Sequence, residues 1–231
     1  MPRTRRLSIL RASCRGVCVK RLTNNSGAFT IIELIVVIAT ILILVGIVLA
    51  AAGYVQKKGA RSRAETEIAA LSAALESYKA DNGIYPRGNV DSTSTSTPYD
   101  TDNLDPRLNG DPTASPAPNV YQKASQVLYS SLSGDSDYDG EIGTTEASNR
   151  IYFNFKPEML YTVTTVVGGS TTTSVRFIRD PFGNSYGYST AQAANPGTNV
   201  GYNPTFDLWS TAGVTTNPAD DTVRQQWIKN W

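Results

Sequence analysis

The longest apolar run of the chain lies near its N-terminus and has the length of a membrane span. Residues 34–52 carry no charge. At a rise of about 1.5 Å per residue they extend about 28 Å, close to the ~30 Å hydrocarbon core of a bilayer. A secretory signal peptide places its apolar region before the cleavage site, and a buried core helix is seldom apolar on all sides. The pattern therefore predicts a single transmembrane helix over residues 29–53.

A second helical pattern follows this run directly. Its apolar positions recur at intervals of three and four residues: Ile68, Leu71, Leu75 and Tyr78. This spacing is typical of an amphipathic helix that buries one face. Asn82-Gly83 is a helix-stop signal, and Pro86 prevents the helix from resuming. We therefore expect one helix from residue 29 to about residue 82, with an amphipathic segment over 54–86 that carries the rest of the protein.

The remaining patterns predict a loop and then a mixed domain. Residues 87–119 read as a low-complexity surface loop, because Ser and Thr alternate over 92–97 and five prolines lie between 98 and 118. A globular region over 120–231 should contain a second helix at 121–133 and strands at 151–155, 160–167 and 174–178, the last two joined as a hairpin at Gly168-Gly169. The predicted fold class is α+β, with a long N-terminal helix packed on a small antiparallel sheet.

Formal charge divides the chain at residue 28. Residues 1–28 hold seven basic residues and no acid; since the net charge of the whole chain is +1, residues 29–231 carry −6. Basic residues before a membrane helix keep that side in the cytoplasm, so the C-terminal region is expected outside. An acidic outer region lacks the basic field that nucleic-acid binding needs.

The positions of the cysteines and the lack of histidine limit the catalytic and metal-binding groups that residues 29–231 can offer. Cys14 and Cys18 both precede residue 28, and the chain has no histidine. Residues 29–231 can therefore form no disulfide, no thiol or imidazole catalytic group and no ordinary zinc site. We expect a protein that is not an enzyme.

Residues 135–146, DSDYDGEIGTTE, have the spacing of an EF-hand calcium loop. Acids stand at loop positions 1, 3, 5 and 12, glycine at 6 and an apolar residue at 8. In such a loop alternate acids wrap oxygens around a hard cation, Gly140 permits the turn and Glu141 offers its backbone carbonyl. The alternative is a solvated turn whose acids cap the local backbone. The predicted Ca²⁺ ligands are Asp135, Asp137, Asp139, Glu141 and Glu146.

One acid stands near the start of the membrane-length run. A carboxylate near mid-membrane costs about 2.5–3.5 kcal/mol, so Glu33 should have a partner, unless it lies shallow and reaches the headgroups. The surrounding segment AFTIIEL, residues 28–34, resembles the class III signal of type IV pilins and type II secretion pseudopilins. In that family a prepilin peptidase cuts before a phenylalanine and N-methylates it.

The resemblance implies a processing site and an assembly residue. Cleavage between Ala28 and Phe29 makes residues 1–28 a leader peptide and Glu33 the fifth mature residue; cleavage after Gly27 is the alternative. In the family the acid at this position pairs with the new amino group of a neighbouring subunit, here that of Phe29. Such pairing of a charge in a low-dielectric helical bundle would set the subunit register.

Later segments are similar to the major pseudopilin of type II secretion. They are YKADNGIYP at 78–86, DPFGNSY at 180–186, FDLWS at 206–210 and the final Asn230-Trp231. Ala50 stands where many pilins have a kinking proline. The family's calcium site begins with an acid after the serine, but this chain has AGVT at 212–215. Asp220 and Asp221 are left as a second candidate metal site.

The function that the resemblance implies is structural. A major pseudopilin is held in the bacterial inner membrane by one span, with its N-terminus cytoplasmic and its C-terminal domain periplasmic, and polymerises through its N-terminal helix into a periplasmic filament. Its partners are further copies, prepilin peptidase, minor pseudopilins, a platform protein and an assembly ATPase. One alternative is a type IV pilus subunit, although those usually close their C-terminal region with a disulfide. The other is a membrane-tethered calcium-dependent binding module that does not polymerise.

Overall fold

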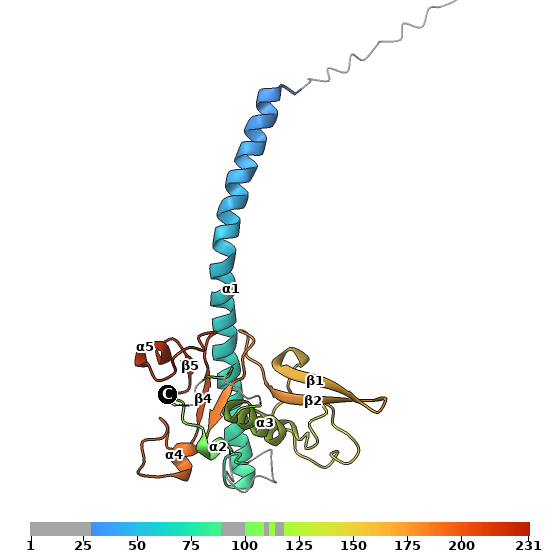
Figure 1. The fold of residues 1–231 in the computed structure, drawn as a ribbon, viewed down its shortest axis with the longest axis vertical. Coiled ribbons are helices and arrows are strands. Elements are labelled where there is room, and N and C mark those ends of the chain that lie inside the picture. Colours follow the sequence, from blue (N-terminus) through green and yellow to red (C-terminus); the bar gives the residue numbers. More distant parts are fainter. Residues whose placement is uncertain (1–28, 89–99, 109–110, 114–117) are drawn as a thin grey trace, which may run out of the picture. The chain divides into compact units, whose positions relative to one another are not determined.

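The computed structural model describes residues 29–88, 100–108, 111–113 and 118–231. The expected leader 1–28, with Ala28 and both cysteines, and the Ser/Thr tract at 92–97 lie outside the described residues. The chain divides into two compact units, Met1–Leu49 and Ala50–Trp231. Its helices and strands, in chain order (Figure 1), are α1 (Ile31–Asn82), α2 (Asp100–Asn103), α3 (Val120–Ser133), β1 (Leu160–Val167), β2 (Ser170–Ile178), β3 (Gly187–Ser189), α4 (Ala191–Ala194), β4 (Asp207–Ser210), α5 (Asp221–Arg224) and β5 (Ile228–Lys229).

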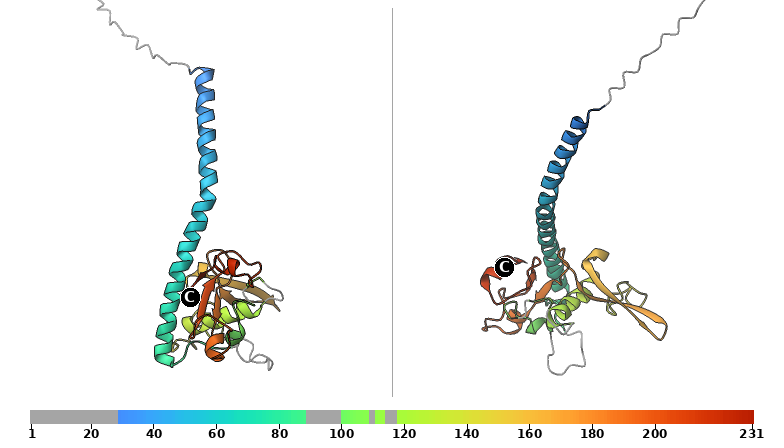
Figure 2. Two further views of the ribbon diagram at one scale, coloured as in Figure 1. Left: turned by 90° about the vertical axis from the view of Figure 1, so that its left-hand side faces the viewer. Right: turned by 45° about the horizontal axis from the view of Figure 1, so that its top comes forward.

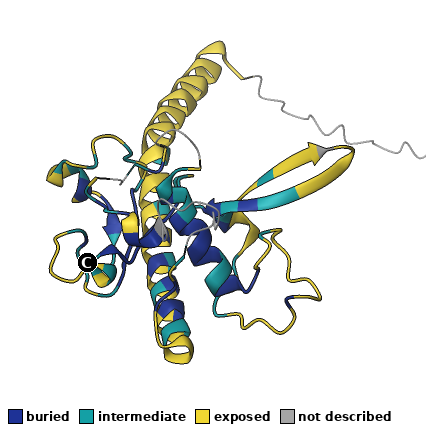
Figure 3. Ribbon diagram, turned by 60° about the horizontal axis from the view of Figure 1, so that its bottom comes forward, coloured by how far each residue is buried: buried dark blue, intermediate teal, exposed yellow. Residues whose placement is uncertain are grey.

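The N-terminal part of α1 is exposed along its length in the part of the chain that the structure describes. Every residue from 29 to 49 is exposed, including large apolar side chains such as Ile31 at 79% and Leu49 at 69%. Figure 3 shows this part of the helix in the colour of exposed residues. α1 is long and apolar enough to cross a membrane, and it begins two residues after the predicted start. Its apolar surface needs a cover of lipid or protein.

The second half of α1 confirms the predicted amphipathic stripe. Its buried residues are Ala64, Ile68, Leu71, Ala74 and Leu75, and Tyr78 is half-buried. Figure 3 shows this part of α1 with dark buried segments alternating with exposed ones. The helix ends as the sequence indicates, because Gly83 adopts a φ of 79° and its N–H donates to the Lys79 carbonyl at 2.8 Å. A positive φ is a conformation that glycine adopts without strain.

The stripe of α1 shares a core with α3 and the strands of the Ala50–Trp231 unit. Leu128 and Leu132 of α3, Ile178 of β2 and Leu208 of β4 all belong to the same buried cluster. The sequence predicted α3 to within one residue, and its side chains at 124, 127, 128 and 132 are buried. The Asn119 side chain caps the helix by accepting the Gln122 N–H at 2.9 Å, and Gly134 ends it with a φ of 82°.

The strands form two antiparallel sheets rather than the single sheet predicted. β1 and β2 make a hairpin with a bulge beside Tyr161 and Thr162, whereas β3, β4 and β5 form a second sheet in that order. The hairpin turn at Gly168-Gly169 is confirmed, with φ values of 59° and 85° that suit a tight two-residue turn. β2 begins four residues before the predicted start at Ser174, because Ser170 already pairs with Val167.

Two sequence predictions for this unit were wrong. Residues 151–155 are not a strand: the N–H groups of Tyr152 and Phe153 both donate to the Leu132 carbonyl at the end of α3, so this segment has no ladder partner. The stretch 87–119 is not a uniform surface loop, because it contains α2 and because Leu104 is fully buried. Leu104 joins a second cluster with Tyr121, Ala124, Trp209 and Trp227.

Candidate functional site

The first candidate site is the start of α1. Glu33 Oε2 accepts hydrogen bonds from the backbone N–H and from the hydroxyl of Thr30, each at 2.9 Å, and the Glu33 N–H donates to Thr30 Oγ1 at 3.3 Å. This reciprocal arrangement is a capping box, and it satisfies amide groups at the N-terminus that have no partner inside the helix. The T-x-x-E spacing of residues 30–33 is the signal that could have predicted it.

The capping box leaves part of the Glu33 carboxylate available. Both hydrogen bonds that this carboxylate accepts go to Oε2, and Oε1 accepts none from the described residues. Phe29 lies just before the cap and is 85% exposed. Cleavage before Phe29 would leave the Thr30 amide in place, because that N–H belongs to the bond between residues 29 and 30. The helix cap and an interaction with a second group are therefore compatible at Glu33.

The second candidate site is the acidic loop 135–146. Asp135 is fully buried, and its carboxylate accepts hydrogen bonds from the N–H groups of Tyr138 at 2.6 Å and Gly140 at 2.9 Å and from the Tyr129 hydroxyl at 2.7 Å. Positive φ values at Tyr138 and Gly140, 63° and 93°, let the backbone fold back over this carboxylate. The loop is thus organised around its first acid.

Three of the five predicted ligands come together in this loop. One carboxylate oxygen from each of Asp135, Asp137 and Asp139 lies within 4.8 Å of the others. Glu141 is exposed and Glu146 is buried, and neither belongs to this group of three. Such hard oxygen donors suit Ca²⁺ or Mg²⁺ rather than softer metals.

The Glu146 side chain instead stabilises the backbone of the loop. Its Oε1 accepts hydrogen bonds from the backbone N–H and hydroxyl of Ser136 and from the Asp137 N–H, and its Oε2 accepts from the Gly143 N–H. These bonds, led by that of the Ser136 hydroxyl, lower the pKa of Glu146. The predicted bidentate closing role is not the arrangement seen here, because the Glu146 carboxylate does not join the three aspartate oxygens and holds loop groups through both of its oxygens.

Mutual repulsion of the acids is visible in the pKa of Asp137. The hydrogen bond from the Asp139 N–H lowers this pKa, but desolvation and the charges of Asp139 and Glu146 outweigh it, so that the pKa of Asp137 is raised. A cation among the three aspartates would remove this repulsion. The residues present therefore fit a divalent cation held by Asp135, Asp137 and Asp139.

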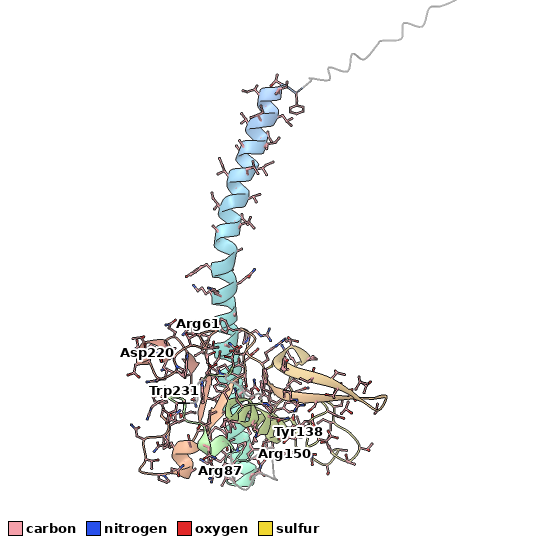
Figure 4. The ribbon with its side chains drawn as sticks, in the orientation of Figure 1. Arg61, Arg87, Tyr138, Arg150, Asp220 and Trp231 are labelled. Atoms are coloured by element: carbon pink, nitrogen blue, oxygen red, sulfur yellow. The ribbon has the colours of Figure 1, made fainter. Side chains whose placement is uncertain are left out.

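The second predicted metal site is not assembled in the described structure. Asp220 caps α5 by accepting the Thr222 N–H at 2.9 Å and its hydroxyl at 2.8 Å, and Asp221 forms an ion pair with Arg224. Figure 4 labels Asp220 beside α5. Both acids therefore have local structural partners, and no group of three possible metal ligands includes them among the described residues.

Asp180 and Asp102 are two of three buried acids, with Asp207, that the sequence did not mark as unusual. Burial raises the pKa of Asp180 to about 6, although its carboxylate accepts hydrogen bonds from Ser210 Oγ at 2.5 Å and from the N–H groups of Phe182 and Asn184. Asp102 is also buried and pairs with Arg87, labelled in Figure 4. Both acids join segments that are distant in sequence, and a motif confined to one segment cannot show such a contact.

The fold and the sites define an α+β protein with one membrane-length helix and an acidic loop that could hold a cation. No protein-family model, curated protein or solved structure matches the chain. The function is therefore argued from the chain's own residues.

Proposed function

We propose that the chain is the precursor of a filament subunit of the type IV pilin class, the major pseudopilin of a type II secretion system. A prepilin peptidase cuts between Ala28 and Phe29, and the released helix polymerises in and above the inner membrane. The role is structural and not enzymatic. The observation that carries the proposal is the surface of residues 29–49, which is apolar and exposed along its length.

This apolar surface can be buried in lipid before assembly and against other subunits after assembly. A single helix of membrane length can lie in lipid as a monomer, and the same apolar side chains can pack against other copies in a bundle. Glu33 is the one charged residue in this stretch. Its Oε1 accepts no hydrogen bond from the described residues and can accept one from the amino group of a neighbouring Phe29 while Oε2 keeps the helix cap. The C-terminal domain stays outside the membrane, because the basic residues precede the helix.

Calcium is the second part of the proposal. Asp135, Asp137 and Asp139 bind Ca²⁺ after export and so order the loop that packs against β2, where the Val175 N–H donates to the Tyr138 carbonyl at 2.7 Å. Subunits then enter the filament in a folded state. Normal assembly of an Asp137→Asn, Asp139→Asn variant in the presence of a chelator would contradict this step.

The test of the proposed function is the mature N-terminus. The chain is expressed with and without a prepilin peptidase, and the N-terminal peptide is identified by mass spectrometry. We expect an N-methylated Phe29 only when the peptidase is present, together with sedimentable filaments. A chain that keeps residues 1–28 under both conditions would overturn the proposal and favour a tethered calcium-dependent module.

A further inference from the structure

The outer part of the β1–β2 hairpin is exposed and uncharged, whereas Val175 and Ile178 near its base are buried and Arg176 carries a charge. It extends away from α3 and from the other strands of the Ala50–Trp231 unit (Figures 1 and 2). Residues 160–175 contain no charged residue and no proline, and Val166 is 67% exposed. Exposed strands usually carry charges or proline that prevent pairing with other chains. Residues 160–175 lack these devices, so the outer part of the hairpin is open to contact with another chain.

A cavity of about 450 Å³ lies at the base of this hairpin. Its lining consists of Pro118, Gln122, Tyr161, Val163, Arg176 and Phe177. The rings of Tyr161 and Phe177 stack with centroids 4.6 Å apart, which makes the floor apolar. No hydrogen bond or ion pair engages the guanidinium of Arg176 in the part of the chain that the structure describes. The cavity therefore suits an apolar side chain next to a carboxylate.

Among the described residues of the Ala50–Trp231 unit outside α1, one segment places an exposed large apolar side chain next to an exposed acid. Ile142 is 42% exposed and follows Glu141, whose exposed side chain forms no hydrogen bond or ion pair with the described residues. The other exposed large apolar residues of this unit outside α1 have no acid next to them in sequence: Ile84, Leu108, Ile151, Tyr161 and Val166. Charge and apolar character thus match the cavity at Glu141-Ile142.

We propose that Glu141 and Ile142 of one subunit dock into the β1–β2 cavity of a second copy of this chain. Ile142 packs on the stacked rings of Tyr161 and Phe177, and the Glu141 carboxylate pairs with Arg176. The two surfaces differ, so the contact is heterologous and repeats from copy to copy, as an open filament requires. The proposal rests on the proposed function and identifies one subunit contact within it.

The loop and the cavity are also joined within each subunit. The loop meets β2 at Val175, which donates to the Tyr138 carbonyl, and the next residue, Arg176, lines the cavity. No ion pair joins Arg176 and Glu141 of one chain in the described structure. In an EF-type loop the seventh position binds the cation through its backbone carbonyl, so the Glu141 side chain remains available when the loop is loaded. Cation binding and docking are therefore compatible.

Disulfide trapping tests the contact directly. Two full-length chains with different tags, one with Glu141→Cys and one with Arg176→Cys, are expressed together with the peptidase and with Cys14 and Cys18 replaced by Ser. Residues 29–231 have no native cysteine, so every disulfide joins introduced cysteines, and one that links the two different tags reports the contact. We expect a disulfide between the two tags, and none when Lys156→Cys, an exposed position away from the cavity lining, replaces Arg176→Cys.

Charge reversal gives the second readout. Arg176→Glu and Glu141→Arg should each lower the yield of sedimentable filaments about tenfold, because like charges then face each other across the contact. The two variants mixed should restore assembly, and Lys156→Glu should behave like the wild type. Tryptophan fluorescence confirms that each variant is folded.

The outcomes separate the two proposals. If the wild type forms filaments but no mixed disulfide appears and Arg176→Glu assembles normally, the docking contact is wrong and the proposed function stands. If the folded single reversals fail and their mixture also fails, the pairing of these two residues is wrong. If the wild type gives no filaments, the proposed function falls first.

Discussion

Trp209 of β4 lies against Gly187 of β3, and the two residues are directly paired across the strands. A Cβ atom at position 187 would lie 2.2 Å from Cε2 of the indole. The ring is fully buried and has Tyr121 on one side, with centroids 5.4 Å apart, and Trp227 at 6.2 Å. Gly187 is therefore required for space and not for an unusual backbone angle.

We predict that Gly187→Ala destabilises the protein. The added methyl group must displace a ring that is packed on several sides, and overpacking of this kind typically costs about 1–3 kcal/mol. Urea unfolding of the full chain in detergent, followed by tryptophan fluorescence, measures the loss. Gly59→Ala in α1 is the matched control, because nothing lies within 4 Å of its Cβ position. That change should stabilise the helix by about 0.5–1 kcal/mol, and equal stabilities of both variants would contradict the packing argument.

Asp180 should make stability depend on pH. Its folded-state pKa of about 6 exceeds the usual value because burial disfavours the charged carboxylate, and the neighbouring Glu67 charge adds to this. The protonated form therefore favours the folded state. The resulting stabilisation is complete below about pH 4 and is lost as the pH rises through about 6, with an upper limit of about 3 kcal/mol.

Asp180→Asn isolates this contribution, since the amide does not titrate. Urea unfolding between pH 4 and 7 should show that the difference in stability between wild type and variant changes across the window from 4 to 6. Asp220→Asn is the control of opposite sign, because hydrogen bonds from Thr222 lower the pKa of this exposed acid. Its stabilising effect is lost as the pH falls. A constant difference between wild type and Asp180→Asn would show that the carboxyl titrates normally.

Local periodicity predicted the two long helices, α1 and α3, and the hairpin well, but not the four-residue helices α2, α4 and α5. The stripe at Ile68, Leu71 and Leu75 is buried, and α3 lies within one residue of its predicted bounds. In these elements the spacing of apolar residues and the capping signals act within a few residues, so they can be read from the sequence. The clustering of the three aspartates in the acidic loop was predictable for the same reason, because all three lie in one tight turn.

Contacts between distant segments could not be predicted in this way. Residues 151–155 have strand composition but no strand beside them, because the end of α3 takes their N–H groups. Leu104 comes from a stretch rich in proline and polar residues, yet it packs with Trp209 and Trp227. The sequence pattern of Glu146 suggested a ligand, whereas the folded loop uses its carboxylate to hold backbone amides. In each case tertiary context overrides the local signal.

Calcium should reverse the effect of Asp139→Asn on stability. Without a cation this change removes a charge that raises the pKa of Asp137, so the variant should be as stable as the wild type or more stable in a chelator. With Ca²⁺ the wild type should gain about 2.7 kcal/mol at a concentration one hundred times the dissociation constant, and the variant should gain less. Thermal unfolding of the full chain with chelator, Ca²⁺ or Mg²⁺ measures the stability of wild type and variant with and without the cation. Asp220→Asn should keep the full calcium response; if it does not, the C-terminal acids bind the ion.

Glu33→Gln and Glu33→Ala separate the helix cap from an assembly role. Glutamine can still accept the Thr30 N–H in a capping box, whereas alanine cannot. If Glu33 acts only as a cap, Glu33→Gln should assemble like the wild type and Glu33→Ala should show a frayed helix start.

We expect instead that both variants are cut normally before Phe29. Both should lose sedimentable filaments by at least about tenfold, because neither supplies the charge that pairs with the new amino group. Mass spectrometry of the N-terminal peptide and sedimentation of filaments measure the two effects in the same cells. Normal filaments from Glu33→Gln would restrict Glu33 to the bonds that it makes with Thr30.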